Sequence, residues 1–330
     1  LAMFNNRLEF TAEWYKNKSE DLLYSVPVPA QTGVSNTSVT MNAASMENSG
    51  FEFSATYRNR DHAFKYDISA NLSTLKNKVT SLGIGKDSYI SGAYATYVGQ
   101  EIGQFYGWVY EGIARTQADL DNHATQQGVN VGDCLYKDIS GPEGTPDGVI
   151  DAYDQTVLGS GLPKVNFGLS THMEYKGFDL NISTYGVLNY HVSDDIYNSL
   201  NSCYGYGNKE VGMLDANRWS EDGTYLSSVP RTYAANNATL AWNDLFSSRK
   251  IQNAAYWKIA NVELGYNFPD KWFGGYVSGV RLYVSAQNLY TFTGYHGYNV
   301  DYAGGTFTPG YNFCSFPSAR TFMAGLHFTF

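Results

Sequence analysis

The segment Arg320-Thr-Phe-Met-Ala-Gly-Leu-His-Phe-Thr-Phe330 is the stretch from which we interpret the fold. Apolar residues take every second position from Phe322 to Phe330, while polar or small residues dominate the other row. A two-residue period predicts a β-strand with one apolar face. The segment suits an ordinary hydrophobic strand, and it equally suits the last strand of a transmembrane β-barrel, whose outward face must be apolar.

The composition of the chain narrows the class of protein further. Aromatic residues make up 16% of its 330 residues, led by 28 tyrosines, and charged residues make up only 16%. Mean hydropathy is nonetheless negative, at −0.34, and no run reaches the roughly 20 apolar residues that a spanning helix requires. A β-barrel has such a composition because only alternate residues face lipid. The net charge of −9 argues against a nucleic-acid partner, because phosphates require a basic surface.

Further alternating segments precede the terminal strand, and we expect about nine or ten strands in total. The clearest segments are Leu8–Tyr15, Phe51–Arg58, Phe64–Ser73, Val165–Tyr175, Phe178–Thr184, Trp257–Phe268 and Val280–Leu289. Short turns are predicted at Arg60–His62 and Lys176–Gly177. Alternation slips by one residue near Ala260 and again at Asn288, so we expect β-bulges there.

Two architectures share this pattern, a soluble β-sandwich and a transmembrane barrel. Strands of this length suit a tilted membrane crossing better than a typical sandwich. Long loops are expected over Tyr89–Leu158, Asp194–Arg249 and Tyr290–Pro317, with a short polar helix at Gln117–Gln127. Short turns that alternate with long loops are typical of outer-membrane barrels. The residues expected on the wet lumen side are Glu9, Glu13, Glu52, Arg58, Lys65, Asp67, Asn71, Arg281 and Gln287.

One acidic segment is a candidate metal site. Its oxygen donors surround glycine-bearing turns, and they are Asp138, Glu143, Asp147, Asp151 and Asp154. Such donors suit a hard cation, Ca²⁺ or Mg²⁺, although the spacing does not match an EF-hand. The alternative is a loop whose carboxylates accept hydrogen bonds from backbone N–H groups and stay solvated.

The sequence contains no catalytic motif, so we do not expect an enzyme. It has no His-Glu-x-x-His zinc motif, no Gly-x-Ser-x-Gly elbow and no phosphate-binding loop. Cys134, Cys203 and Cys314 show no metal or redox spacing. Free thiols are the simpler interpretation, with one disulfide as the alternative.

Eight aromatic residues in the predicted loops are candidates for stacking on sugar rings or for contact with a lid protein. They are Tyr204, Tyr206, Trp219, Trp242, Tyr295, Tyr298, Tyr302 and Tyr311. The alternatives are ordinary loop packing, or the aromatic girdle that outer-membrane barrels carry.

Short blocks along nearly the whole chain resemble, in order, the C-terminal half of the barrel in SusC/RagA-like TonB-dependent outer-membrane transporters. Among them are Trp14–Lys16, Asn48–Glu52, Leu75–Val79, Gly103–Gly107, Asp147–Asp151, Tyr175–Asp179 and Gln287–Leu289. Gly325, Phe328 and Phe330 also resemble the terminal signal by which such barrels reach their assembly machinery. Residues 1–330 thus look like about ten strands of an antiparallel barrel of roughly 22 strands. The plug domain and first barrel half are expected outside this sequence.

The resemblance implies energy-coupled import in the outer membrane of a Gram-negative bacterium. The implied substrates are oligosaccharides or, less often, peptides. The implied partners are a SusD-like surface lipoprotein lid, TonB through the plug, outer-membrane lipid, and a second transporter–lid pair in a dimer. Two other classes stay open from the residues alone, namely a secreted or surface carbohydrate-binding β-protein and a purely structural surface protein. Detergent-dependent solubility and heat-modifiable gel migration distinguish the importer from both.

Overall fold

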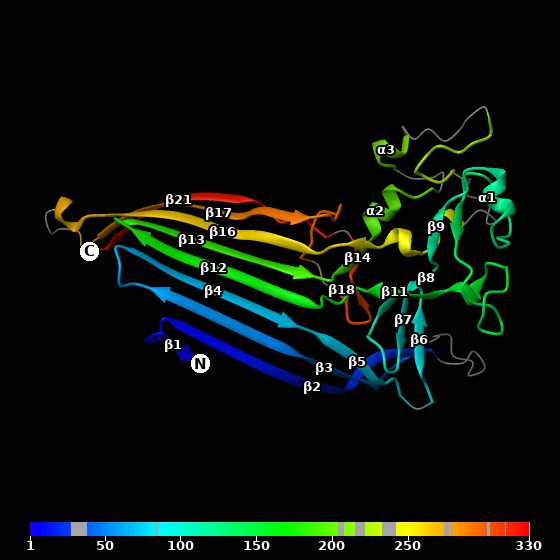
Figure 1. The fold of residues 1–330 in the computed structure, drawn as a ribbon, viewed down its shortest axis with the longest axis horizontal. Coiled ribbons are helices and arrows are strands. Elements are labelled where there is room, and N and C mark those ends of the chain that lie inside the picture. The colour runs from blue at the N-terminus through cyan, green and yellow to red at the C-terminus, as the bar shows by residue number, and fades with distance from the viewer. Residues whose placement is uncertain are drawn as a thin grey trace.

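The computed structural model describes most of the chain. The described residues are 1–27, 38–83, 85–203, 208–214, 222–232, 242–273, 277, 279–301, 304–313 and 315–329. They form an elongated wall of strands and, at one end of it, a cap of shorter elements (Figure 1). In this described part, no helix is both long enough and apolar enough to cross a membrane.

The wall is one antiparallel sheet of ten strands in the order β1-β2-β3-β4-β12-β13-β16-β17-β21, with β5 paired to β3 beside β4. Its strands are β1 (Ala2–Met3), β2 (Leu8–Pro27), β3 (Ser38–Asn59), β4 (Phe64–Thr74), β5 (Lys76–Ser81), β12 (Val165–Tyr175), β13 (Phe178–Leu188), β16 (Tyr256–Phe268), β17 (Gly279–Thr293) and β21 (Thr321–Thr329). The sheet is open, with β1 at one edge and β21 at the other. This confirms the predicted antiparallel segment of a larger barrel.

Short connections lie at one end of the wall, and the cap lies at the other (Figure 1). The tightest connection joins β12 to β13 through Lys176 and Gly177, whose φ angles are 48° and 87°. Two consecutive positive φ angles are typical of a type I′ turn, which fits the twist of a hairpin. The pairing of Tyr175 with Phe178 continues unbroken to Val165 and Leu188.

The registers divide the wall into an apolar face and a polar face. On the terminal strand, Phe322, Leu326 and Phe328 are paired with Ala286, Leu282 and Val280, so the alternation expected from the sequence is confirmed. All nine residues predicted for the lumen side share the polar face. Both expected bulges are present: Ala260 is the extra residue where β16 pairs with β13, and the pairing of β16 with β17 shifts at Asn288, whose φ is 52°.

The apolar face carries aromatic rings at both ends of the wall. Near the short turns, the ring centroids of Phe178 and Tyr266 lie 4.7 Å apart, and near the cap Trp257 stacks on Phe292 at 5.2 Å. From Trp257 to Tyr266 the strand rises roughly 30 Å, at about 3.3 Å per residue. For a strand tilted by about 40°, this gives roughly 23 Å of height, close to the apolar band of about 25 Å in outer-membrane barrels.

The cap corrects one expectation from the sequence. Residues Tyr89–Leu158 are not simply a long exposed loop, because they contribute most of a four-stranded sheet, β11-β8-β7-β6, and the hairpin β9–β10. The short strands of the cap are β6 (Ser88–Ser91), β7 (Tyr94–Tyr97), β8 (Gln104–Gly107), β9 (Tyr110–Ile113), β10 (Cys134–Tyr136), β11 (Thr156–Ser160), β14 (His191–Asp194), β15 (Gln252–Asn253), β18 (Gly304–Gly305), β19 (Thr308–Pro309) and β20 (Tyr311–Asn312). Phe105, Cys134 and Tyr136 are fully buried there.

The helices are short and belong to the connections. They are α1 (Gln117–Asp121), α2 (Asp195–Leu200), α3 (Val211–Leu214) and the 3-10 turns η2 (Ala152–Asp154), η4 (Ser248–Lys250) and η5 (Asp270–Trp272). Helix α1 begins at the predicted residue but stops at Asp121 rather than at Gln127. Thr116 and Asp119 form a capping box at its start, which fixes this boundary.

Buried amides join the wall to the cap where β4 gives way to β5. Asn77 is 5% exposed; its Nδ2 donates to Asn48 Oδ1 at 2.7 Å, and its Oδ1 accepts from the backbone N–H of Ile102 at 2.9 Å. A buried amide with both ends satisfied fixes the position of its neighbours. The cap strand region at Ile102 is therefore tied directly to the wall.

Candidate functional site

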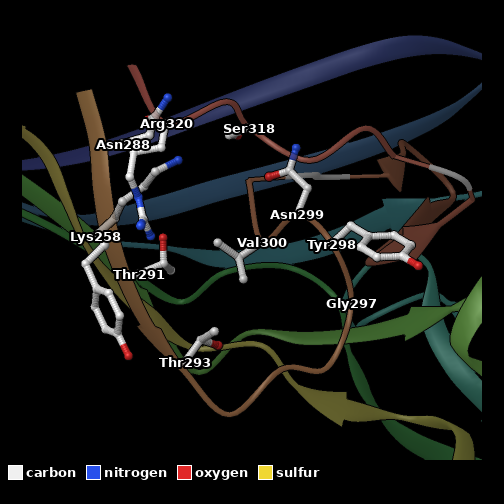
Figure 2. A pocket seen from close by; sticks show the side chains of 11 residues that line it. Lys258, Asn288, Thr291, Thr293, Gly297, Tyr298, Asn299, Val300, Ser318 and Arg320 are labelled. Atoms are coloured by element: carbon white, nitrogen blue, oxygen red, sulfur yellow. The ribbon is translucent and has the colours of Figure 1, made fainter. Parts of the chain in front are cut away.

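A cavity of about 330 Å³ opens on the polar face at the cap end of β16 and β17. Its lining combines hydroxyl, amide and cationic groups (Figure 2). It also has two exposed rings, of which Tyr298 lies in the loop after β17 and Tyr290 belongs to the apolar row of β17. The lining residues that matter most for recognition are Thr291, Tyr298, Asn299 and Arg320, because the Thr293 hydroxyl is already bonded to the backbone of Ala255 and Tyr295. Such a surface offers hydrogen bonds and one stacking face to a polar solute.

Lys258 lines the same cavity, but its ammonium group already has an ion-pair partner. Its Nζ lies 2.6 Å from Asp301 Oδ2, and its side chain is only 4% exposed. The Tyr185 hydroxyl donates a hydrogen bond to Asp301 Oδ1 at 3.2 Å. These contacts fasten the loop after β17 to the wall. Within the described residues, Arg320 takes part in no ion pair, so it is the cation available to a solute.

Tyr295 is a buried structural residue and is not exposed for recognition of a solute. Its ring is 6% exposed, its hydroxyl donates to Asp194, and Asn312 Nδ2 donates to the same hydroxyl at 2.7 Å. Burial, followed by the hydrogen bond to Asp194, raises the pKa of Tyr295. The predicted direct contact of Tyr295 with substrate or lid does not fit this geometry, because little of its ring is accessible.

The other predicted aromatic residues have different positions. Tyr298 is 63% exposed beside the cavity, and Tyr311 is half-buried on β20, where its ring stacks near Phe313. Trp242 packs against Tyr136 with ring centroids 6.0 Å apart. Tyr204, Tyr206, Trp219 and Tyr302 lie outside the described residues. Of the predicted set, Tyr298 is the described residue that is best placed to meet a solute.

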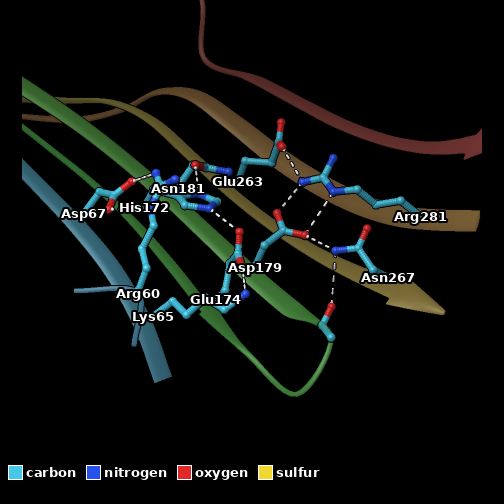
Figure 3. Close-up of polar contacts among 11 residues, drawn as sticks. Arg60, Lys65, Asp67, His172, Glu174, Asp179, Asn181, Glu263, Asn267 and Arg281 are labelled. Atoms are coloured by element: carbon cyan, nitrogen blue, oxygen red, sulfur yellow. Dashed lines mark hydrogen bonds and ion pairs between the residues drawn. The ribbon is translucent and has the colours of Figure 1, made fainter. Parts of the chain in front are cut away.

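A second polar group lies on the same face, close to the short turns (Figure 3). Arg281 donates from Nη2 to Asp179 Oδ1 at 2.5 Å and to Glu263 Oε1 at 2.7 Å. Asn267 Nδ2 donates to Asp179 Oδ2 at 3.0 Å. The sequence predicted Arg281 on this face but not its partners, because these contacts depend on the strand register.

A neighbouring set of polar contacts lies on β4, β12 and β13. His172 Nε2 lies 2.9 Å from Glu174 Oε1 and His172 Nδ1 lies 2.7 Å from Asn181 Oδ1. Lys65 Nζ lies 3.4 Å from the other carboxylate oxygen of Glu174, and Arg60 forms an ion pair with Asp67. The polar face is thus a charged but largely self-neutralised surface. Such a surface interacts with water and polar solutes without holding them tightly.

Two glycines on the polar face lie beneath large neighbouring side chains. A Cβ atom on Gly265 would lie 2.5 Å from both Arg281 Nη2 and Asp179 Oδ2, and one on Gly325 would lie 2.5 Å from the Tyr283 ring. Gly325 belongs to the predicted terminal signal, and so do Phe328, on the apolar face, and Phe330, outside the described residues. The close approach of the Tyr283 ring explains why position 325 is a glycine.

The acidic segment does not converge on one point. Asp154 is fully buried and accepts from the backbone N–H groups of Ile139, Ser140 and Asp151. Asp138, Asp147 and Asp151 each accept from a backbone N–H group as well, whereas Glu143 is exposed. Among the described residues, no group of three acidic, histidine or cysteine side chains is arranged to hold a metal ion. The carboxylates therefore act as caps for backbone N–H groups. A Ca²⁺ or Mg²⁺ site stays a prediction that these contacts do not support.

Comparison with known proteins supports the interpretation of the fold. No protein-family model matches the chain. TonB-dependent receptor P3 of Formosa agariphila is 32% identical over 349 residues, covering 100% of this chain and 33% of that receptor. TonB-dependent receptor SusC of Bacteroides thetaiotaomicron is 27% identical over 345 residues, covering 100% of this chain and 31% of that protein. The RagAB peptide transporter structure superposes with a TM-score of 0.77 at 23% identity, covering 98% of this chain and 33% of that one.

An open antiparallel wall with two unlike faces, superposed on the RagAB structure, has the fold of a segment of a larger antiparallel β-barrel. Within this class, the sequence resembles SusC/RagA-like TonB-dependent receptors along its whole length. The chain spans about one third of the length of the curated relatives it matches.

Proposed function

We propose that this chain forms part of the wall and outer loops of a nutrient importer in the outer membrane of a Gram-negative bacterium. The observation that carries the proposal is one open sheet with an apolar band on one face and a charged, self-neutralised surface on the other. In the complete receptor the apolar face contacts lipid and the polar face lines the lumen. No enzymatic activity is proposed.

The open sheet also supports a larger barrel. Its edge strands carry backbone N–H and C=O groups that lipid cannot satisfy. Further strands of the same receptor are therefore proposed to continue the wall, and a plug inside the lumen is proposed to contact TonB. The cap at the far end from the short turns is then on the outer surface, where a SusD-like lipoprotein lid is proposed to dock. Assembly of two transporter–lid pairs is part of the same proposal.

The substrate proposed for the cavity is a polar oligosaccharide. The Thr291 hydroxyl, the Asn299 amide and the Arg320 guanidinium supply donors to sugar oxygens, and Tyr298 supplies one stacking ring. Each such aromatic face contributes about 1 kcal/mol, so affinity arises from many weak contacts. A peptide is the second candidate, since the RagAB structure is that of a peptide transporter.

The test is uptake by cells whose complete receptor carries Tyr298→Ala together with Arg320→Gln. We expect slower growth on the limiting substrate while the receptor still shows heat-modifiable migration. Tyr153→Ala is the matched control, because Tyr153 is 56% exposed but lies outside the cavity. Unchanged growth of the double variant removes this cavity from the uptake path. A receptor that never enters the membrane contradicts the proposed function as a whole.

A further inference from the structure

Four lysines gather on the outward face of the wall. Lys16 and Lys18 lie on β2, Lys76 and Lys78 lie on β5, and we call these four the lysine patch. The strand between them, β3, pairs Glu47 with Lys18 on one side and with Lys78 on the other. Figure 1 shows β5 at the cap end of the wall. The patch therefore lies at the end that the proposed function assigns to the outer surface.

Strand alternation places the patch on the same face as the apolar band. Trp14 is paired with Phe51, and both rings are exposed on that face. Residues two positions apart share a face, so Lys16 follows Trp14 directly on the outward row. On β5 the intervening Asn77 points the other way, into its buried contact with Asn48. The apolar row thus ends at Trp14, and lysines begin at the next outward position.

The patch carries more positive charge than its neighbours neutralise. Lys16 forms an ion pair with Glu47 at 3.0 Å, and Lys18 with Glu20 at 2.5 Å. No ion pair involves the exposed Lys76 or Lys78 within the part of the chain that the structure describes.

Asp21, in the bulge after Glu20, adds one further acid. Even so, this region stays positive in a chain whose net charge is −9.

The spacing of the patch suits a head group with more than one phosphate. Lysines two residues apart on a strand are separated by roughly 7 Å, and lysines two strands apart by roughly 10 Å. Long flexible stems let each ammonium group adjust by several bonds and bind phosphate as a point charge. A protein partner fits less well, because lysine is depleted in protein interfaces and aromatic anchors are enriched there.

We propose that the lysine patch binds the phosphorylated head group of a lipid in the outer leaflet. The inference rests on the proposed placement of the wall in the outer membrane. Immediately above the apolar band, outward side chains meet head groups rather than acyl chains. Lys76 and Lys78 supply the unneutralised charge, while Lys16 and Lys18 extend the surface. The patch then acts as a specific lipid contact on the outside of the barrel, apart from the solute path.

The experiment compares lipid binding by the complete receptor and its Lys76→Gln/Lys78→Gln variant. The probe is diphosphoryl lipid A, with phosphatidylethanolamine as the zwitterionic comparison, and retained lipid is counted by native mass spectrometry. We expect lipid A binding to weaken roughly tenfold or more, with no change for phosphatidylethanolamine. The control, Lys86→Gln/Lys137→Gln, removes the same charge from cap residues and is expected to bind like the unmodified receptor.

Each outcome bears on the inference separately from the proposed function. The inference is overturned if the patch variant retains as much lipid A as the unmodified receptor. It is also overturned if the control loses as much lipid A as the patch variant does. The variant keeps the Lys16–Glu47 pair, so it is not expected to disturb folding, and heat-modifiable migration checks this. An inserted receptor that imports solute but shows no dependence on the patch overturns only the lipid contact. A receptor that does not insert contradicts the membrane placement itself.

Discussion

The Nζ atom of Lys258 lies 2.6 Å from Asp301 Oδ2, and this ion pair fastens a cap loop to the polar face of the wall. The Lys258 side chain is 4% exposed and that of Asp301 is 27% exposed, so the pair is largely shielded from water. A shielded ammonium group is costly once its partner is removed. The position of the loop at the candidate cavity therefore depends on this contact.

We expect Asp301→Asn to loosen the loop after β17 by about 2–3 kcal/mol, because Lys258 would stay buried without a counter-charge. Hydrogen exchange of residues 294–301 in the complete receptor measures this effect. Replacing both partners, as Lys258→Met/Asp301→Leu, should restore much of the protection, since no buried charge then remains. Equal exchange in the single variant and the unmodified receptor would show that the pair does not anchor the loop.

The acidic segment depends on Asp154 as a backbone cap. Asp154→Asn should loosen residues 138–154 by about 2–4 kcal/mol, because an amide offers one acceptor oxygen where three N–H groups now donate to a carboxylate. Limited proteolysis of the segment is the measurement. Asp147→Asn is the milder control, since this exposed carboxylate accepts from Val149 alone.

The same proteolysis also examines the predicted cation. The capping geometry leads us to expect identical cleavage with and without a chelator. Faster cleavage after chelation would instead support a bound Ca²⁺ or Mg²⁺ ion.

Gly325 should be intolerant of a side chain. In Gly325→Ala the new methyl group would lie 2.5 Å from the Tyr283 ring, and such overpacking costs about 1–3 kcal/mol. We expect a smaller fraction of receptor with heat-modifiable migration. Gly294→Ala is the control, because nothing lies within 4 Å of its Cβ position. Adding Tyr283→Ala to Gly325→Ala should recover assembly, and failure to do so would locate the requirement for glycine elsewhere.

Cys134 should resist alkylation in the native receptor. Burial, as the main cause, raises the pKa of its thiol to about 12. A raised pKa favours the neutral thiol, and the reactive thiolate therefore becomes scarce at every pH below this value. We expect no modification by iodoacetamide at pH 8 until denaturant is added, as followed by peptide mass spectrometry. Rapid labelling of the native receptor would contradict the buried environment.

The wall was predictable from the sequence because its strands are long and have unlike faces. Alternation identified β12 and β13 and even the slips at Ala260 and Asn288, since a bulge moves every later residue to the opposite row. The cap was not predictable in this way. Its strands, such as β7 and β8, span only four residues, too few for a two-residue period to be distinguished from chance.

The candidate site was predictable only in part, because exposure is decided by distant contacts. Tyr295 and Tyr298 have similar local sequences, yet Tyr295 is buried by contacts with Asp194, which lies about a hundred residues earlier. Arg320 was not singled out as a solute contact, since a single arginine before a strand carries no local signal. The lumen-facing row, in contrast, followed directly from alternation.

Gly265 and Gly325 have a consequence for the bore of the proposed channel. Arg281 and Tyr283 lie flat across these glycines and do not stand upright from the sheet. A long side chain that lies along the sheet projects only a short way into the lumen. The free cross-section beside this part of the wall is therefore wider than the size of these residues suggests. In receptor that still assembles, a side chain at either glycine would push its neighbour into the solute path and narrow the channel.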